Sequence, residues 1–213
     1  MIKKPSYIGR LISIEGIDGS GKTTLAKCIV QELSKQGLKT FFTQEPGGTD
    51  LGATLRHILH TQKAQVCDTA EFLLFAADRA QHFHQIIVPA LQEGTIVLAD
   101  RLADSSLAYQ GYGRGLDQTM IKTINQWAMQ NITPDATLFL RIDPDQALAR
   151  VLGRNEELTS FEQEKRNFWQ RVADGYEKIF AERTNVITLD AMQPQEALCK
   201  QAVQALLTFI AHK

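Results

Sequence analysis

The residues best suited to chemistry form a glycine-rich segment near the start of the chain. Gly16, Gly21, Lys22 and Thr23 match the phosphate-binding pattern G-x-x-x-x-G-K-[ST], directly after the apolar run 11–14. Such glycines turn backbone N–H groups towards an anion, while the lysine places a charge near the β- and γ-phosphates and the threonine offers a hydroxyl to Mg²⁺. The segment therefore predicts an ATP or GTP site. The residues expected to form it are Gly16, Ile17, Asp18, Gly19, Ser20, Gly21, Lys22, Thr23 and Thr24.

A carboxylate and a guanidinium follow a second apolar run, at residues 96–99. Asp100 is suited to hold Mg²⁺ together with Thr23, and Arg101 to clamp a phosphate. A surface salt bridge is the alternative, but a strand end beside the phosphate loop favours the functional interpretation. Three more arginines, at positions 56, 79 and 114, exceed what one nucleotide can use. We therefore expect a second substrate that carries a phosphate.

Extended and helical patterns alternate along the chain, which is typical of an α/β fold with a parallel sheet and helices on both faces. The first helix is expected from Lys22 to about Gln36, stopped by Gly37, and the last from about Pro194 to Ala211. Ligands of such sheets collect at the carboxyl ends of the strands, where both phosphate-site elements lie. The expected strands are Leu11–Glu15, Thr40–Gln44, Thr95–Asp100, Ala136–Ile142 and Asn185–Leu189.

Composition favours one cytoplasmic domain. The 213 residues are 44% hydrophobic without a linker-like shift, so we expect a single domain over residues 1–213. The net charge of −1 and the lack of an 18-residue apolar run argue against polymeric nucleic acid or a membrane as a partner. Cys28, Cys67 and Cys199 are odd in number and far apart, so we expect neither a disulfide nor a zinc site.

Two segments are expected to be surface loops, Gly111–Gly115 and Gly153–Ser160. Loops over a phosphate site can close on a substrate. Histidines 57, 60, 82 and 84 lie on expected helices. Because a metal site would need more ligands in reach, we expect them to be ordinary helix residues.

Five motifs in order along the chain resemble those of the thymidylate kinases. They are E-G-x-D-G-x-G-K-T-T (Glu15–Thr24), E-P-G-G-T (Glu45–Thr49), L-L-F-A-A-D-R (Leu73–Arg79), D-R-x-x-D-S-S-x-A-Y-Q-G (Asp100–Gly111) and G-R-G-x-D (Gly113–Asp117). The resemblance covers essentially the whole chain. It implies a P-loop NTPase fold with a five-stranded parallel sheet, a mobile lid at about residues 150–164 and a homodimer. The implied reaction is transfer of the γ-phosphoryl group of Mg-ATP to dTMP, giving dTDP and ADP for dTTP synthesis.

The resemblance implies a thymine pocket. In the family, the aromatic ring at the Phe75 position stacks on thymine and the arginine at the Arg79 position hydrogen-bonds the base. Their i, i+4 spacing places both on one helix face, although Phe75 taken alone would be interpreted as a core aromatic. Ser106 and Gln110 match the bacterial-type thymine pocket. Tyr109 matches the wall beside the deoxyribose.

The resemblance also implies how the rest of dTMP is held. Asp18 matches the carboxylate that takes up the 3′-hydroxyl group, and Arg56 and Arg101 match the arginines that hold the phosphate. Their purpose would be alignment, because phosphoryl transfer asks the protein mainly to position donor and acceptor and to offset charge. Glu45 is expected to brace the acceptor site, with a simple strand-end turn as the alternative.

The expected lid departs from the family pattern. Position 19 is glycine where one subgroup has a catalytic arginine, so that charge is expected from the lid. Leu152 and Ser160 stand where arginines would align. Arg154 is therefore the expected lid cation, with Lys22 and Arg101 as the other catalytic cations. Arg150 is left with a structural role or an ATP contact.

Two alternatives remain open. A broader deoxynucleoside monophosphate kinase would share the arginines but lack thymine selectivity. A nucleotide-dependent switch would share the phosphate loop and the Mg²⁺ carboxylate. It would have no need for a stacking aromatic ring or for a second set of phosphate arginines, and its ATP turnover would not depend on a monophosphate.

Overall fold

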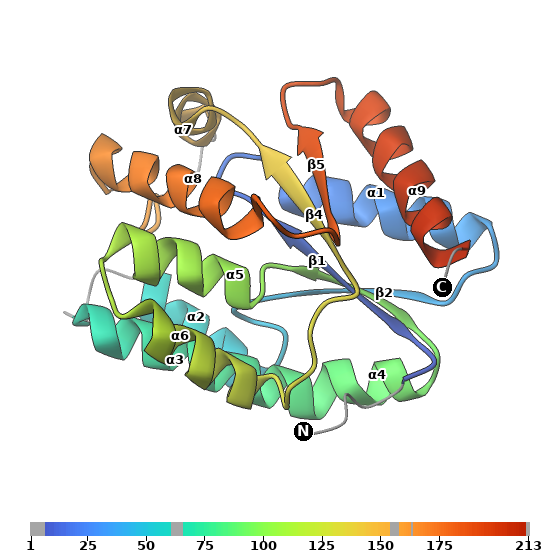
Figure 1. The fold of residues 1–213 in the computed structure, drawn as a ribbon, viewed down its shortest axis with the longest axis horizontal. Coiled ribbons are helices and arrows are strands. Elements are labelled where there is room, and N and C mark those ends of the chain that lie inside the picture. Colours follow the sequence, from blue (N-terminus) through green and yellow to red (C-terminus); the bar gives the residue numbers. More distant parts are fainter. Residues whose placement is uncertain (1–6, 61–65, 154–157, 163, 212–213) are drawn as a thin grey trace.

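A five-stranded parallel sheet forms the centre of the molecule (Figure 1). The computed structural model describes residues 7–60, 66–153, 158–162 and 164–211. The strands, in the order β2-β3-β1-β4-β5, all run parallel. The α/β fold class is thus confirmed, and each expected strand lies within one residue of an observed one. The strands are β1 (Arg10–Glu15), β2 (Thr40–Gln44), β3 (Ile96–Asp100), β4 (Ala136–Arg141) and β5 (Val186–Asp190).

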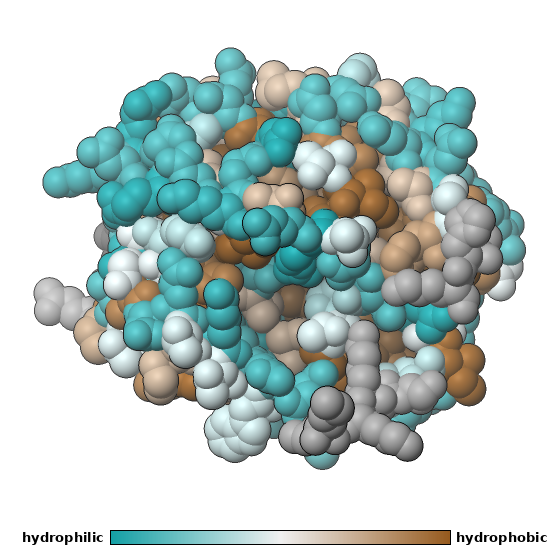
Figure 2. All heavy atoms as spheres, viewed as in Figure 1, coloured by the Kyte–Doolittle hydropathy of each residue, from teal (hydrophilic) through white to brown (hydrophobic). Residues whose placement is uncertain are grey.

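Helices cover both faces of this sheet (Figure 1). They are α1 (Lys22–Lys35), α2 (Asp50–His60), α3 (Asp68–His82), α4 (Val88–Gln92), α5 (Ala103–Ser106), α6 (Gln118–Ala128), α7 (Pro144–Leu152), α8 (Arg166–Phe180) and α9 (Gln195–Ala211). Two π-helical segments, η1 (Phe83–Ile87) and η2 (Leu107–Gly113), continue α3 and α5. No helix among the described residues is long and apolar enough to cross a membrane. Hydrophilic side chains cover most of the face seen in Figure 2.

Successive side chains of the inner strands point alternately to the two faces of the sheet, so the hydrophobic core has a part on each face. Ile12 and Ile14 of β1 pack with Leu25 and Ile29 of α1 on one face. Leu11, one position away, packs with η1 and α4 on the other. Because successive side chains of a strand point to opposite faces, a strand buried on both sides is apolar throughout. This explains why β1 and β3 read as short continuous apolar runs.

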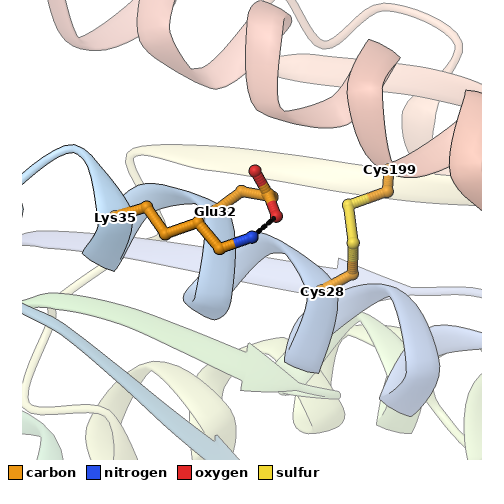
Figure 3. Close-up of a disulfide and its surroundings, with 4 residues drawn as sticks. All are labelled: Cys28, Glu32, Lys35 and Cys199. Atoms are coloured by element: carbon orange, nitrogen blue, oxygen red, sulfur yellow. Dashed lines mark hydrogen bonds and ion pairs between the residues drawn. A yellow bond between two sulfur atoms is a disulfide. The ribbon is translucent and has the colours of Figure 1, made fainter.

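A disulfide joins the first helix to the last, and the expectation of no disulfide is wrong. Cys28 of α1 and Cys199 of α9 are bonded, with their Cα atoms 6.2 Å apart (Figure 3). The two helices pack side by side on one face of the sheet, so residues separated by 171 positions in the sequence become neighbours. Cys67 is free and exposed. Spacing along the chain could not reveal this pairing because it depends on how α9 returns to α1.

We predict that this disulfide contributes about 2–4 kcal/mol to the free energy of unfolding, because it restricts the unfolded chain. Cys28→Ala should lower the urea midpoint of the oxidised protein, and a reductant should lower the wild-type midpoint by a similar amount. Cys67→Ala is the matched control and should leave the midpoint in place. Equal midpoints for oxidised wild type and Cys28→Ala would contradict the prediction.

The expected loop Gly111–Gly115 is also corrected. Gly111 and Gly113 are buried in the π-helical segment η2, a half-buried turn follows at Arg114, and Gly115 is exposed. A Cβ atom at Gly113 would come within 2.6 Å of Phe168 on α8. The glycine therefore permits close helix packing here. Part of the other expected loop, Gly153–Ser160, lies outside the described residues.

Candidate active site

A cavity of about 280 Å³ opens at the carboxyl ends of β1, β2 and β3. Strand register brings these ends together, since Ile14 and Gln44 both pair with Asp100. Fifteen of the expected site residues line this one cavity. They are Asp18, Gly19, Gly21, Lys22, Thr23, Thr24, Glu45, Arg56, Phe75, Arg79, Asp100, Arg101, Ser106, Tyr109 and Gln110.

The phosphate loop connects β1 to α1 in the expected way. Gly19 and Gly21 adopt positive φ angles of 83° and 93°, which residues other than glycine rarely adopt. Lys22 is buried and donates to the Ile17 carbonyl oxygen, with Nζ and O 2.9 Å apart. Burial, and then the charge of Arg101, lower the pKa of Lys22 to about 8. Three expected members of the loop, at positions 16, 17 and 20, do not line the cavity.

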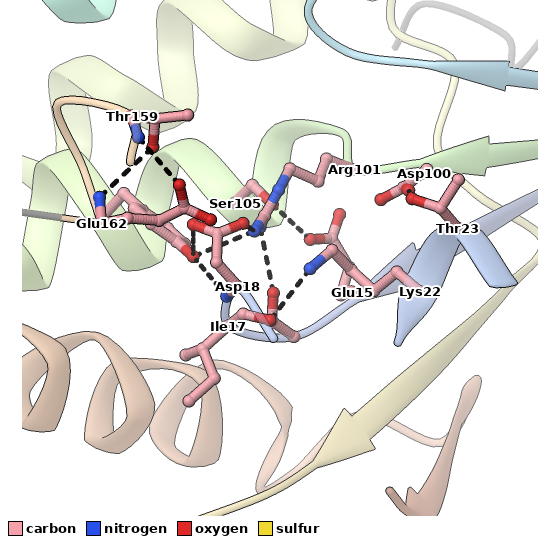
Figure 4. A network of polar contacts seen from close by, with 12 residues as sticks. Glu15, Ile17, Asp18, Lys22, Thr23, Asp100, Arg101, Ser105, Thr159 and Glu162 are labelled. Carbon is pink, nitrogen blue, oxygen red and sulfur yellow. Dashed lines mark hydrogen bonds and ion pairs between the residues drawn. The ribbon is translucent and has the colours of Figure 1, made fainter. Parts of the chain in front are cut away.

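Thr23 and Asp100 lie together at the edge of the cavity. The Thr23 hydroxyl group donates to Asp100 Oδ2 at 2.5 Å, as the adjacent sticks in Figure 4 show. Both residues offer hard oxygen ligands beside the phosphate loop, and Asp100 is buried. This donor set fits Mg²⁺, which is bound through one or two protein oxygens together with the oxygens of a nucleotide phosphate. A bound Mg²⁺ would neutralise charge on the phosphates.

Arg101 is the most heavily bonded cation of the site (Figure 4). Its Nη2 atom contacts Asp18 Oδ1 at 2.5 Å and the Tyr109 hydroxyl oxygen at 3.0 Å. Its Nη1 atom donates to the carbonyl oxygen of Gly16 at 3.0 Å and to the hydroxyl oxygens of Ser105 and Tyr176. The backbone of Arg101 is left-handed, with φ of 73°. A non-glycine residue holds that conformation only where its surroundings enforce it.

Asp18 remains ionised although it is half-buried. Burial opposes its negative charge, but the charges of Arg101 and Lys22 outweigh burial and hold the pKa of Asp18 well below its usual range. The Tyr109 hydroxyl group also donates to Asp18 Oδ2 at 3.0 Å. The ionised carboxylate can therefore accept a hydrogen bond from a ligand hydroxyl group.

Aromatic rings form the far wall of the cavity. Phe75 is half-buried on α3, and its ring centre lies 5.8 Å from that of Phe161. Phe161 also meets Tyr109 edge to face, with their ring centres 6.1 Å apart. Flat rings on the wall of a polar cavity can hold a planar heterocycle. Phe161 was not among the expected site residues because it falls in the lid stretch, whose path the sequence pattern does not give.

Arg79 is nearly inaccessible and is held by groups from three elements. Its Nη1 atom donates to Ser106 Oγ at 3.0 Å and to Asn125 Oδ1 of α6 at 2.6 Å. Its Nε atom lies 2.8 Å from Glu45 Oε2, an ion-pair contact that is not aligned as a hydrogen bond. Glu45 Oε1 lies 3.0 Å from Nδ1 of the buried His82. Glu45 thus braces the wall of the cavity.

Two further contacts stabilise the expected acceptor residues. Gln110 donates to Glu71 Oε1 at 2.8 Å, and Glu71 in turn pairs with Arg114. Arg56 donates to the Pro46 carbonyl oxygen at 2.9 Å, which fixes it above the turn that follows β2. Arg114 also pairs with Glu164, which links the end of the expected lid stretch to this wall.

The structure describes only one of the two arginines considered for the expected lid. Arg154, the expected lid cation, lies outside the described residues. Arg150 donates to the Ala191 carbonyl oxygen at 2.9 Å and lies 3.5 Å from the Gly19 carbonyl oxygen. It therefore connects α7 to the turn after β5, close to the phosphate loop.

Several cavity residues were missed or misjudged from the sequence. His60 lines the cavity, and His82 belongs to the buried Glu45 network, so neither is an ordinary helix residue. Burial, and then the charge of Arg56, lower the pKa of His60 to about 4. The i, i+4 spacing of Arg56 and His60 on α2 was the available signal. The partners of His82 are Thr43 on β2 and Glu45 directly after it, far away in the sequence, so no local signal existed.

Comparison with known proteins agrees with this geometry. The family model "Thymidylate kinase" matches residues 14–202. A thymidylate kinase of Halothermothrix orenii is 42% identical over 195 residues, covering 91% of this chain and 94% of its own. One from Synechococcus sp. (strain CC9902) is 44% identical over 205 residues, covering 93% and 97%. The phosphate loop, the Asp100–Arg101 pair and the aromatic wall thus occur in a chain that belongs to the thymidylate kinase family.

Proposed function

We propose that this protein is a dTMP kinase that transfers the γ-phosphoryl group of Mg-ATP to dTMP. An oxygen of the dTMP phosphate bonds to the γ-phosphorus, the bond to the β–γ bridging oxygen breaks, and ADP leaves. The observation that carries the proposal is that one cavity contains both a phosphate loop and a base-sized aromatic wall, with arginines between them. A site of this form can align donor and acceptor phosphates, which is the main requirement of the reaction.

The donor end would be formed by the phosphate loop. Lys22 would lie along the β- and γ-phosphates, and Thr23 and Asp100 would hold Mg²⁺. Arg101 lines the same cavity and would offset charge on the transferring group. We propose that Arg154 adds a second cation from the lid, at about residues 150–164 of a single domain spanning residues 1–213.

The acceptor end would be formed by α2, α3 and η2. Phe75 would stack on thymine, and Arg79 and Gln110 would hydrogen-bond its edge, with Ser106 completing the pocket. Tyr109 would form the deoxyribose wall.

The sugar and the phosphate of dTMP would lie nearer the centre of the cavity. The ionised Asp18 would accept the 3′-hydroxyl hydrogen bond. Arg56 and Arg101 would hold the phosphate, and Glu45 would brace Arg79. The acceptor is already a phosphate oxygen, so no strongly basic group is needed.

Dependence of ATP turnover on an acceptor tests the proposed reaction. We expect purified protein with Mg-ATP to form little ADP alone, and to form ADP and dTDP in equal amounts once dTMP is added. The reason is that the proposed site aligns two phosphates, so transfer needs the second phosphate in place. ADP formation that does not respond to dTMP would contradict the proposal and favour the nucleotide-dependent switch.

We also propose a homodimer formed through α2, α3 and α6. Helix α3 packs beside both α2 and α6, and these three helices expose large apolar side chains. A second copy would cover them, and a homodimer is what the family resemblance implies. Sedimentation equilibrium should therefore give twice the chain mass of 23.8 kDa, and a monomer at micromolar concentration would contradict this. The exposed residues are Leu51, Leu73, Met120 and Trp127.

A cytoplasmic location is a further proposal. Reducing compartments keep thiols reduced. Although Cys28 and Cys199 are bonded in the structure, the pair should therefore be largely thiols when cells are quenched and the protein is alkylated, and the disulfide should form once the purified protein is oxidised. A fully formed disulfide in freshly quenched cells would contradict a cytoplasmic location.

A further inference from the structure

Glu15, the last residue of β1, is a fully buried carboxylate with four hydrogen-bond donors. Its Oε1 atom accepts from the Leu102 backbone N–H at 2.8 Å and from the Ser13 hydroxyl group at 2.8 Å. Its Oε2 atom accepts from the hydroxyl groups of Ser105 at 2.6 Å and Tyr176 at 3.2 Å. Glu15 does not line the cavity, so it has no direct access to a substrate.

Two of these four donors connect Glu15 to Arg101. Nη1 of Arg101 donates to Ser105 Oγ at 3.0 Å and to the Tyr176 hydroxyl oxygen at 3.2 Å. A hydroxyl group has one hydrogen and two lone pairs. The two hydroxyl oxygens also lie 2.9 Å apart, so either can donate to the other. When both give their hydrogens to the carboxylate, their lone pairs remain to accept from the guanidinium. An acceptor at position 15 therefore favours the arrangement in which both hydroxyl groups point their hydrogens away from Arg101.

Glu15 also holds the backbone on which Arg101 is mounted. The Arg101 N–H donates to the Ile14 carbonyl oxygen at 3.0 Å, and the next N–H, that of Leu102, donates to Glu15. These two bonds attach both sides of the left-handed residue, with its φ of 73°, to the end of β1. Such a conformation is maintained by its neighbours.

A carboxylate at position 15 carries an electrostatic cost, because its surroundings disfavour the charged form. Burial, and then the charge of Asp104, raise the pKa of Glu15 to about 7, while Ser105, Arg101 and Ser13 oppose the rise. An apolar side chain would avoid this cost, but it would leave the Leu102 N–H and the Ser105 hydroxyl group without their acceptor.

We propose that Glu15 is a positioning residue for phosphoryl transfer. It aims the Arg101 guanidinium at the transferring group through Ser105 and Tyr176, and it fixes the Arg101 backbone through Leu102. This inference rests on the proposed role of Arg101 in transfer. Misplacing a catalytic group by about 1 Å can cost on the order of 100-fold in rate, so the effect should appear in kcat.

The test is Glu15→Gln, which keeps the size of the side chain. The amide group of glutamine keeps one acceptor oxygen but replaces the other with a donor. In one orientation the Leu102 N–H faces a donor, and in the other Ser105 and Tyr176 do, so either orientation breaks one of the two links to Arg101. We expect kcat to fall about 30-fold, with the KM for ATP changed by less than about threefold. Ser13→Ala is the matched control, because it removes one bond to Glu15 that does not lead to Arg101. Its kcat should stay within about threefold of wild type.

A double variant separates positioning from general destabilisation. In an Arg101→Ala background, Glu15→Gln should cause no further loss of kcat, because the group it positions is absent. A 30-fold loss in both backgrounds would overturn the inference. The inference would also be overturned if Glu15→Gln kept the wild-type kcat while Arg101→Ala lost most of it. That result would still support the proposed function. If Arg101→Ala itself kept full kcat, the proposed transfer role would fall as well.

A second variant keeps the test available if Glu15→Gln does not fold. Tyr176→Phe retains the buried ring and removes the hydroxyl link between Glu15 and Arg101, together with the contact of that hydroxyl group to Ser105. We expect kcat to fall about fivefold in the wild-type background and not at all in the Arg101→Ala background. An equal loss in both backgrounds would overturn the inference.

Discussion

Replacing Arg101 with alanine is expected to lower kcat for dTMP phosphorylation about 10³-fold, because one cation on the transferring group can contribute that much to phosphoryl transfer. Arg101 faces the shared cavity from the end of β3, with its guanidinium beside Asp18 and within reach of both ends of the site. The measurement is a steady-state assay of ADP formation at saturating ATP and dTMP, with circular dichroism to verify the fold.

Arg141→Ala is the matched control for Arg101→Ala. Arg141 is also an arginine at a strand end, but it is exposed and pairs with Glu177 away from the cavity. Its removal should leave kcat within about twofold of wild type, as expected for a surface pair. A folded Arg101→Ala enzyme with more than a tenth of wild-type kcat would contradict the role given to Arg101 here.

Replacing Arg79 with leucine is expected to lower the free energy of unfolding by about 3–5 kcal/mol, because a buried carboxylate is left without its cation. Arg79 and Glu45 side chains are 2% and 1% exposed, so water cannot take over the lost contact. The KM for dTMP should rise in the same variant, since Arg79 lines the cavity. Urea unfolding and dTMP titration measure the two effects.

Two further variants interpret that result. Adding Glu45→Gln to Arg79→Leu should recover part of the stability, because the unpaired charge is then removed as well. Arg166→Leu breaks the exposed pair with Asp145 and should change stability little. If Arg79→Leu proved as stable as wild type, Glu45 would have to be compensated by another group, and the proposed bracing would be wrong.

The sheet and the phosphate loop could be predicted because their signals are local. Each strand is a short apolar or β-branched run bounded by turn residues, and β1 leads directly into the glycines of the loop. The i, i+4 spacing likewise placed Phe75 and Arg79 on one helix face. Motif order then located the Asp100–Arg101 pair at the edge where the strands end.

Features that depend on distant pairs could not be predicted. The Cys28–Cys199 bond exists because α9 packs beside α1, and Asn125 matters only because α6 brings it to Arg79. Glu15 lies within the first motif, but its partner Tyr176 is 161 residues away. Glycine at position 113 indicated a loop because the same residue permits both turns and close helix contacts.

Acceptor selectivity tests the central claim most directly. Initial rates of ADP formation should be compared for dTMP, dUMP, dGMP, dCMP and AMP at equal concentration with saturating Mg-ATP. We predict the highest kcat/KM for dTMP and weaker turnover of dUMP, by about 10- to 100-fold, because a single methyl group supplies only about 1–3 kcal/mol of discrimination. Equal turnover of dGMP or AMP would contradict a thymine pocket formed by Phe75, Arg79 and Gln110.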